Sequence, residues 1–119
     1  MKVAVVGCRH LIVKHLEDYL PANVTEIVSG GARGIDSCAE YFARTHGLPL
    51  TVFYPDYDRY GKGAPLRRNN LIVQYADMVL AFWDGVSRGT AYTLRVCQNA
   101  GKPYKIFLVQ ADGTYKEQT

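Results

Sequence analysis

A glycine-rich segment contains the residue types that most clearly suggest chemistry. It reads Ser29-Gly30-Gly31-Ala32-Arg33-Gly34-Ile35-Asp36, with three glycines within five residues. Glycines let a backbone approach a ligand closely, and the segment leads into an expected helix whose first N–H groups can bind an anion. It is neither a Walker A loop nor a Gly-x-Gly-x-x-Gly motif. We interpret it as a ligand-contacting loop, in which Asp36 either contacts the ligand or only complements the helix dipole.

A second candidate segment, Gly7-Cys8-Arg9-His10, follows the first apolar run of the chain. Gly7 permits a sharp turn, and the helix expected beyond it would offer free N–H groups and the positive end of its dipole. Arg9 adds a cation at the same place. The alternative is an ordinary strand-to-helix turn with an arginine on the surface.

The third candidate segment is Trp83-Asp84-Gly85-Val86-Ser87-Arg88-Gly89-Thr90. Hydroxyls and backbone N–H groups of Ser87, Gly89 and Thr90 fall at an expected helix start, where Arg88 adds charge, although Ser87 could be only an N-cap. Asp84 accepts hydrogen bonds either from ribose hydroxyls or within the turn. Trp83 either stacks on a base or fills the crevice wall.

This third segment also matches the Gly-x-Ser-x-Gly elbow of α/β-hydrolases. Those enzymes place a histidine after the nucleophile in the chain, and no histidine follows Ser87. We therefore reject a serine hydrolase.

Cations and aromatic rings gather in a fourth segment. From Arg59 to Asn70 there are four cations, including Arg68 beside Asn69, and no acid, and Tyr54, Tyr57 and Tyr60 lie within or just before this stretch. Together with the glycine loops, this composition favours a phosphate or pyrophosphate ligand with aromatic stacking for a base.

The elements that must position these residues alternate along the chain. Buried-type strands are predicted at 2–6, 25–28, 50–54, 78–82 and 104–109, and helices at 11–20, 35–46, 65–75 and 89–100. Residues 55–64 read as a polar, aromatic loop, and Asp112-Gly113 predicts a turn into a short edge strand at 114–116. This alternation predicts an α/β, Rossmann-like three-layer sandwich with parallel sheet order 3-2-1-4-5 and a possible C-terminal antiparallel edge strand.

That strand order brings the three candidate loops together. The chain switches direction between the first and fourth strands, and open α/β sheets bind ligands at the carboxyl ends of strands beside such a switch. We therefore expect the loops after strands one, two and four to form one crevice.

Length and composition limit the other possibilities. The 119 residues predict one domain, 1–119. Three cysteines argue against a disulfide scaffold, the three histidines lack metal-binding spacing, and no stretch approaches the ~18 apolar residues of a membrane span. We expect a cytoplasmic protein without a metal. The net charge of +3 is too small to indicate a nucleic-acid partner by itself.

Several ordered motifs resemble the SLOG superfamily, the Rossmann-like group that joins DprA (Smf) and the LOG cytokinin-activating enzymes. They are residues 29–36, the opening Val-Ala-Val-Val-Gly-Cys-Arg, the tyrosine-rich 54–62 segment, Arg68-Asn69, and residues 81–90. The small stand-alone YspA-like or YpsA-related branch resembles the chain most, over roughly residues 2–107. The resemblance implies a pocket for a nucleotide-derived ligand, such as an ADP-ribose or NAD-related molecule, no required cofactor, and often a homodimer.

Carried over by position, the resemblance adds ligand-lining roles to residues of all four segments. The predicted binding residues are Gly7, Cys8, Arg9, Ser29, Gly30, Gly31, Ala32, Arg33, Gly34, Asp36, Arg68, Asn69, Trp83, Asp84, Ser87, Arg88, Gly89 and Thr90. Two positions depart from the family pattern. Cys8 replaces a usual serine, and Thr93 stands where LOG enzymes carry a glutamate, which argues against their glycosidic-bond cleavage.

Three functions remain open from the sequence. The first is binding or sensing of a nucleotide-derived small molecule, with residues 57–63 as a lid. The second is a hydrolase or transferase acting on the N-glycosidic or phosphate bonds of nucleotides, with Asp84 or Asp36 as the carboxylate. The third, less favoured, is single-stranded DNA binding, in which Tyr57 and Tyr60 would stack on bases.

Overall fold

A computed structural model describes residues 1–118 and contains one six-stranded sheet in the order β3-β2-β1-β4-β5-β6. The strands are β1 (Lys2–Gly7), β2 (Glu26–Ser29), β3 (Leu50–Val52), β4 (Met78–Trp83), β5 (Tyr104–Val109) and β6 (Tyr115–Gln118). The helices are α1 (Ile35–Thr45), α2 (Tyr57–Tyr60), α3 (Ala64–Tyr75) and α4 (Arg88–Ala100), with 3-10 turns η1 (Leu16–Asp18) and η2 (Gly61–Gly63). The predicted parallel order and the antiparallel edge are both confirmed.

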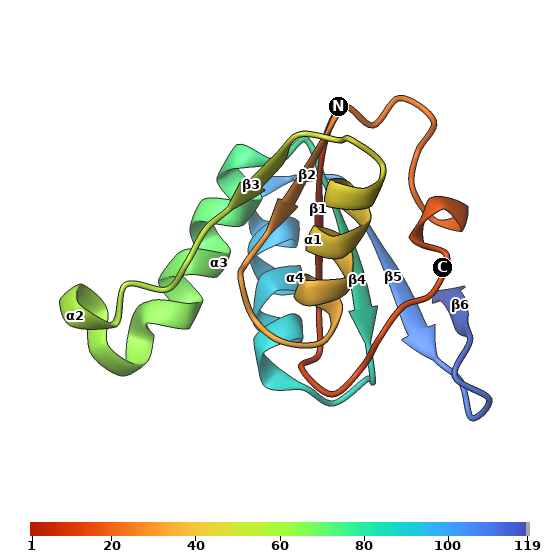
Figure 1. The fold of residues 1–119 in the computed structure, drawn as a ribbon. Helices are drawn as coiled ribbons and strands as arrows, with labels where there is room; N and C mark the ends of the chain where they lie inside the picture. The colour runs from red at the N-terminus through yellow and green to blue at the C-terminus, as the bar shows by residue number, and fades with distance from the viewer. Residues whose placement is uncertain (119) are drawn as a thin grey trace.

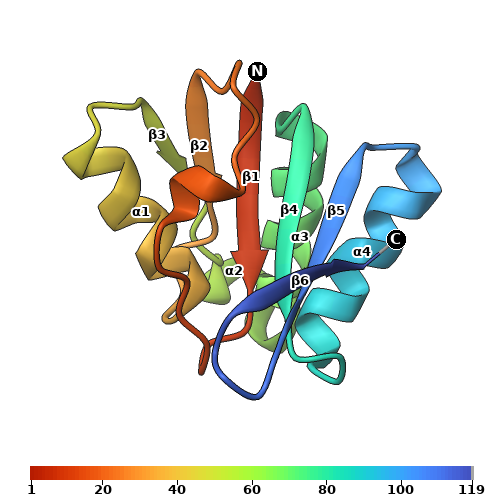
Figure 2. The ribbon, with the colours of Figure 1, turned by 90° about the vertical axis from the view of Figure 1, so that its right-hand side faces the viewer.

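Both faces of the sheet are covered, as a run of buried β-branched residues requires. Figure 2 shows α1 and the β1–β2 connection on one face, with α3 and α4 behind the other. Side chains of β1 alternate between two cores: Val3 and Val5 pack with α1, whereas Ala4 and Val6 pack with α3 and α4. The predicted three-layer arrangement is therefore present, with β1 at its centre.

The helix predicted at 11–20 is wrong. The chain there is irregular apart from the single turn η1. His15 has a φ of 56°, a left-handed conformation that an α-helix cannot contain, and Ile12 is exposed. Leu16 and Tyr19 instead pack on the sheet face beside Phe82. The apolar residues of this segment are thus buried by packing directly on the sheet, although the segment forms no α-helix.

The segment predicted as a loop at 55–64 is also more ordered than expected. It contains α2 and η2, and the Asp56 side chain caps α2 by accepting a hydrogen bond from Arg59 N at 3.2 Å. In Figure 1 this segment extends away from the sheet before α3 returns to it. Among residues 1–118, no helix is long and apolar enough to cross a membrane.

Candidate functional site

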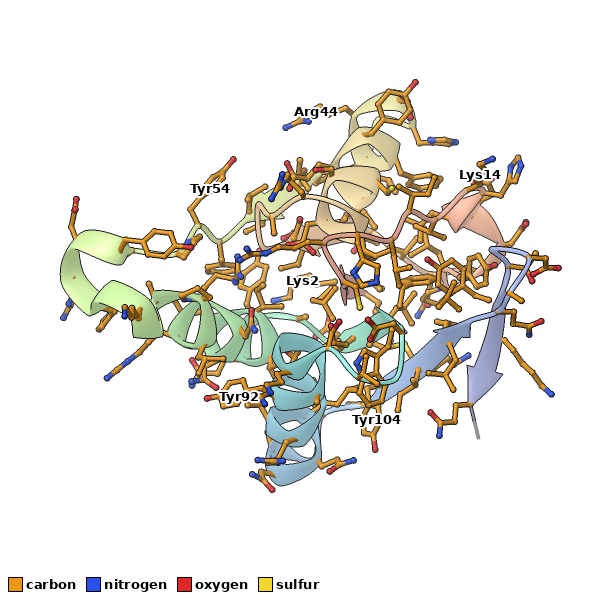
Figure 3. All side chains as sticks on the ribbon, turned by 90° about the horizontal axis from the view of Figure 1, so that it is seen from below. Lys2, Lys14, Arg44, Tyr54, Tyr92 and Tyr104 are labelled. Atoms are coloured by element: carbon orange, nitrogen blue, oxygen red, sulfur yellow. The ribbon has the colours of Figure 1, made fainter. Side chains whose placement is uncertain are left out.

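A cavity of about 400 Å³ lies at the carboxyl ends of the strands. Figure 3 looks onto this edge of the sheet from below. The lining comes from the ends of β1, the β2–α1 loop, the first turns of α3, and the start of α4. We call this space the inner cavity. The predicted convergence of the loops after β1, β2 and β4 is therefore present.

Ten of the predicted binding residues line the inner cavity. They are Gly7, Cys8, Arg9, Ala32, Asp36, Arg68, Asn69, Ser87, Gly89 and Thr90. Thr93, at the position of the LOG glutamate, lines it as well, buried and donating its hydroxyl to the Gly89 carbonyl at 3.1 Å. The hydroxyl of Thr93 is thus already engaged within α4.

An outer cavity of about 390 Å³ adjoins the first. Its lining is aromatic and cationic: Arg9, Gly31, Ala32, Arg33, Tyr54, Pro55, Tyr57 and Arg68. Tyr54, labelled in Figure 3, lies on the segment between β3 and α2. Its ring lies against Gly31, where an added Cβ would be 2.6 Å from the ring carbons. Gly31 is therefore needed for contact with the protein's own aromatic side chain.

Two other glycines of the site hold its walls together. A Cβ on Gly7 would be 2.3 Å from the Phe82 carbonyl oxygen, and one on Gly34 would be 2.5 Å from the Cys8 and Arg9 carbonyl oxygens. Gly34 also has a φ of 76°, which disfavours a side chain. These glycines bring the loop after β1 against the start of α1.

Arg68 and Asp36 form a buried charged centre beneath Gly30. The Arg68 side chain is 7% exposed, donates through one terminal nitrogen to the Gly30 carbonyl, and donates through Nε to Asn69 Oδ1 at 2.7 Å. Asp36 Oδ2 accepts from Ala32 N at 3.1 Å. A Cβ on Gly30 would lie 2.8 Å from the Arg68 guanidinium and 2.9 Å from Asp36 Oδ2. Gly30 is therefore a structural contact of this centre.

Burial raises the pKa of Asp36 to about 6, against the opposing hydrogen bond from Ala32 and the charge of Arg68. A carboxyl with this pKa, in the wall of a cavity, can both hold and release a proton near neutral pH.

The raised pKa of Asp36 predicts a pH dependence of stability. The folded state binds the Asp36 proton more tightly than the unfolded chain, whose value is near 3.8, so this contribution is present below pH ~4 and is lost as the pH rises through about 6. Relative to Asp36→Asn, wild-type protein should lose roughly 2–3 kcal/mol of unfolding free energy between pH 4 and 7. Urea denaturation of both proteins across this range measures it. A constant difference between them would contradict the raised pKa.

Asp84 organises the β4–α4 loop. Its Oδ1 accepts from Val86 N at 2.9 Å and Ser87 N at 2.7 Å, and its Oδ2 accepts from Ser87 Oγ at 2.8 Å. Partial burial raises the pKa of Asp84, but these hydrogen bonds outweigh it and hold the pKa well below its usual range. Asp84 is thus an ionised carboxylate, unsuited to be a general acid.

A chain of polar contacts links Asp84 to the loop after β1. Cys8 Sγ donates to Ser87 Oγ at 3.2 Å, and His10 Nε2 lies 3.3 Å from Asp84 Oδ2. Asp84 therefore stands between the imidazole and the serine hydroxyl, whereas a serine hydrolase places the imidazole next to that hydroxyl. This arrangement is a second argument against a serine hydrolase, independent of the order of the residues in the chain.

Six predicted binding residues line neither cavity: Ser29, Gly30, Gly34, Trp83, Asp84 and Arg88. Ser29 is buried and donates to Glu40 Oε2 at 2.9 Å. Trp83 packs on the core of the α3 and α4 face, and its indole N–H donates to the Ser87 carbonyl at 3.0 Å. Trp83 and Asp84 therefore shape the loop that presents Ser87, Gly89 and Thr90.

The helix dipole expected after β1 is absent, because the β1–β2 connection contains no α-helix. The start of α4 lines the inner cavity instead, through Gly89 and Thr90. A Cβ on Gly89 would meet no atom within 4 Å, so the backbone there is open to a ligand. The first turn of a helix leaves its N–H groups without intrahelical partners, which suits an anion.

Besides Thr93, the inner cavity is lined by five residues that are not among the predicted binding residues: Val6, His10, Pro65, Leu66 and Ile72. His10 directly follows the candidate Arg9, and this adjacency was the only available signal. Pro65 and Leu66 lie in the first turn of α3. The chain first extends away from the sheet through α2 and then brings this turn to the cavity, and hydrophobic periodicity does not reveal that path. Within the part of the chain that the structure describes, no group of three or more His, Cys, Asp or Glu side chains could hold a metal ion.

Comparison with known proteins relates this chain to a phage protein. No protein-family model matches the chain. The chain is 40% identical over 83 residues to the "Gene 61 protein" of Mycobacterium phage D29. That match covers 65% of this chain and 66% of the phage protein, so the chain spans just under two thirds of its relative.

Proposed function

We propose that this chain is a SLOG-like module that binds a nucleotide-derived anionic small molecule at the carboxyl edge of its sheet. The observation that carries the proposal is the convergence of Arg9 and Arg68 with the start of α4 around one cavity. Helix N–H groups and arginine guanidinium groups are the common protein ligands of phosphate. The motif resemblance and the Rossmann-like strand order support the same assignment.

The surrounding groups suit the remainder of a nucleotide. Hydroxyls of Ser87 and Thr90 and the Asp36 carboxyl line the inner cavity, where sugar hydroxyls could exchange hydrogen bonds with them. The rings of Tyr54 and Tyr57 line the outer cavity, where a base could stack.

Removing the exposed cation of the site tests this proposal. Isothermal titration calorimetry with ADP-ribose, NAD and AMP should give binding to wild-type protein, and Arg9→Gln should weaken it about tenfold, because a charge-assisted contact to phosphate is lost. Arg95→Gln, an exposed arginine of α4 that lines neither cavity, should leave binding unchanged. Absence of heat with all three ligands at 5 mM, the upper end of an ordinary titration, would contradict the proposal.

Asp36 favours a second candidate, a hydrolase acting on nucleotide bonds. It is buried, lines the cavity, and has a pKa near 6. The carboxylate of Asp84, the other candidate, already accepts three hydrogen bonds from Val86 and Ser87 within its own loop. Incubation with nucleoside monophosphates and NAD followed by chromatography tests for product, and turnover that survives Asp36→Asn would remove Asp36 from the mechanism.

A further inference from the structure

A separate cavity of about 470 Å³ lies between α1 and the irregular segment that leads into η1. Figure 2 shows this segment beside α1 on the same face of the sheet. The residues that line the cavity are Val13, Lys14, His15, Leu16, Glu17, Ser37, Cys38, Tyr41, Phe42, Thr45 and His46. None of them lines the inner or the outer cavity. We call this space the α1 cavity, and its volume is in the range of about 300–1,000 Å³ that is usual for ligand pockets.

One wall of the α1 cavity has a strained backbone. His15, with φ 56° and ψ 54°, is the only non-glycine residue with a positive φ in the described range 1–118. Val13 and Leu16 on either side of it are buried in the core, and Val13 N donates to Cys38 Sγ of α1 at 3.5 Å. Such strain persists only where the surrounding structure imposes it, and it is concentrated at functional sites. The wall is therefore fixed by packing rather than collapsed onto α1.

The His46 imidazole presents a hydrogen-bond acceptor in a fixed orientation. Its ring stacks on Phe42, with centroids 3.9 Å apart and an interplanar angle of 18°. His46 Nδ1 lies 3.0 Å from the Phe42 carbonyl oxygen, which can only accept, so Nδ1 carries the proton of the neutral ring. Nε2 is then the acceptor, and no side chain or backbone group of residues 1–118 donates to it. A ligand with an O–H or N–H group can supply the missing donor.

The fixed charges of the α1 cavity cancel. With both imidazoles neutral, Lys14 and Glu17 contribute one charge of each sign. The pKa of Glu17 is held below its usual range by its backbone hydrogen bond and by His15, whose Nδ1 lies 3.4 Å from Glu17 Oε1. Glu17 is therefore ionised and balances Lys14. This lining favours a neutral ligand, in contrast to the cationic lining of the nucleotide site.

We propose that the α1 cavity binds a small, neutral aromatic molecule that carries one hydrogen-bond donor, of the phenol or indole class. Its ring packs against the apolar side chains of Val13, Leu16 and Phe42, and its O–H or N–H donates to His46 Nε2. The ring of Tyr41, which is 70% exposed beside the cavity, covers the ligand from the solvent side. This inference is independent of the proposed function, because the two sites share no lining residue.

Titration of the ¹⁵N-labelled full chain with phenol and with anisole, its methyl ether, tests the inference through amide chemical shifts. Both ligands present the same ring, but only phenol can donate a hydrogen bond. Phenol should shift residues 13–17 and 37–46 saturably and bind about fivefold tighter than anisole, the effect of one hydrogen bond. His46→Phe keeps a ring on Phe42 but removes the acceptor, so it should abolish this preference. Arg44→Gln, an exposed residue of α1 that does not line the cavity, should retain it.

A third ligand, N-acetyltyrosinamide, separates a free small molecule from the tyrosine side chain of a partner protein. Phenol should bind at least as tightly, and tighter binding of N-acetyltyrosinamide would overturn the assignment to a small molecule. Equal affinities of phenol and anisole for the wild-type chain, phenol shifts confined to residues of the inner and outer cavities, or no saturable shift would also overturn the inference. None of these results bears on nucleotide binding, which the titration with ADP-ribose tests separately.

Discussion

Gly34→Ala is expected to lower the free energy of unfolding by about 4 kcal/mol. Two causes act together. The left-handed φ of 76° costs a side chain about 1–2 kcal/mol, and the new Cβ would lie 2.5 Å from two carbonyl oxygens of the loop after β1. Because those oxygens belong to the backbone, the loop itself must move, and Arg9 moves with it. Urea denaturation measures the loss.

Gly101→Ala separates the two causes of that loss. Gly101 also has a positive φ, 66°, but a Cβ there would meet no atom within 4 Å. It should therefore show the conformational cost alone, about 1–2 kcal/mol. Equal losses for the two variants would mean that the contact between Gly34 and the loop after β1 has no energetic consequence.

Arg68→Leu is expected to lower the free energy of unfolding by about 3 kcal/mol and to abolish nucleotide binding. The substitution leaves the Gly30 carbonyl without the guanidinium it accepts from, and it leaves buried Asp36 without its neighbouring positive charge. Leaving a buried polar group without its partner costs about 1–3 kcal/mol, and more when the group is charged. Denaturation curves and calorimetry with ADP-ribose measure the two effects.

The neighbouring residue provides the control for Arg68→Leu. Arg67 is exposed and lies 4.5 Å from the centroid of the Tyr60 ring. Arg67→Leu should cost within about 1 kcal/mol, since exposed cation–π contacts are weak. If the two arginine variants are equally stable, the buried centre of Arg68 and Asp36 does not stabilise the fold. If Arg68→Leu binds ADP-ribose normally, Arg68 has no part in the site.

The sheet could be predicted from sequence because its strands are buried on both faces. Runs such as Val3–Val6 contain only apolar residues, which leaves few alternatives to a central parallel strand. For residues 11–20, prediction from the apolar pattern failed. Their apolar spacing fits a helix, but His15 adopts a left-handed conformation and Tyr19 packs directly on Phe82. Tertiary packing overrode a local pattern that was equally compatible with two structures.

The segments that form the candidate site could be predicted from sequence more fully than the contacts that their residues make. Strand order brings Gly7, Ala32 and Thr90 to one cavity, as expected. The contacts that occupy Gly30, Gly34 and Asp84 depend on distances between loops that no spacing in the sequence encodes. Glycines that suggest a ligand from sequence alone are partly required by the protein's own close packing. The outer cavity depends on where Tyr54 lies relative to Gly31, which is set by the β3–α2 connection.

The central claim is that a nucleotide anion binds where Arg9, Arg68 and the start of α4 meet. Titration of ¹⁵N-labelled protein with ADP-ribose, followed by amide chemical shifts, tests this position residue by residue. We predict that the largest shifts fall on Arg9, on residues 31–33, and on Gly89 and Thr90. Saturating shifts confined to the opposite side of α1, around Tyr41 and His46, or no shifts at 5 mM ligand, the upper end of an ordinary titration, would contradict the account.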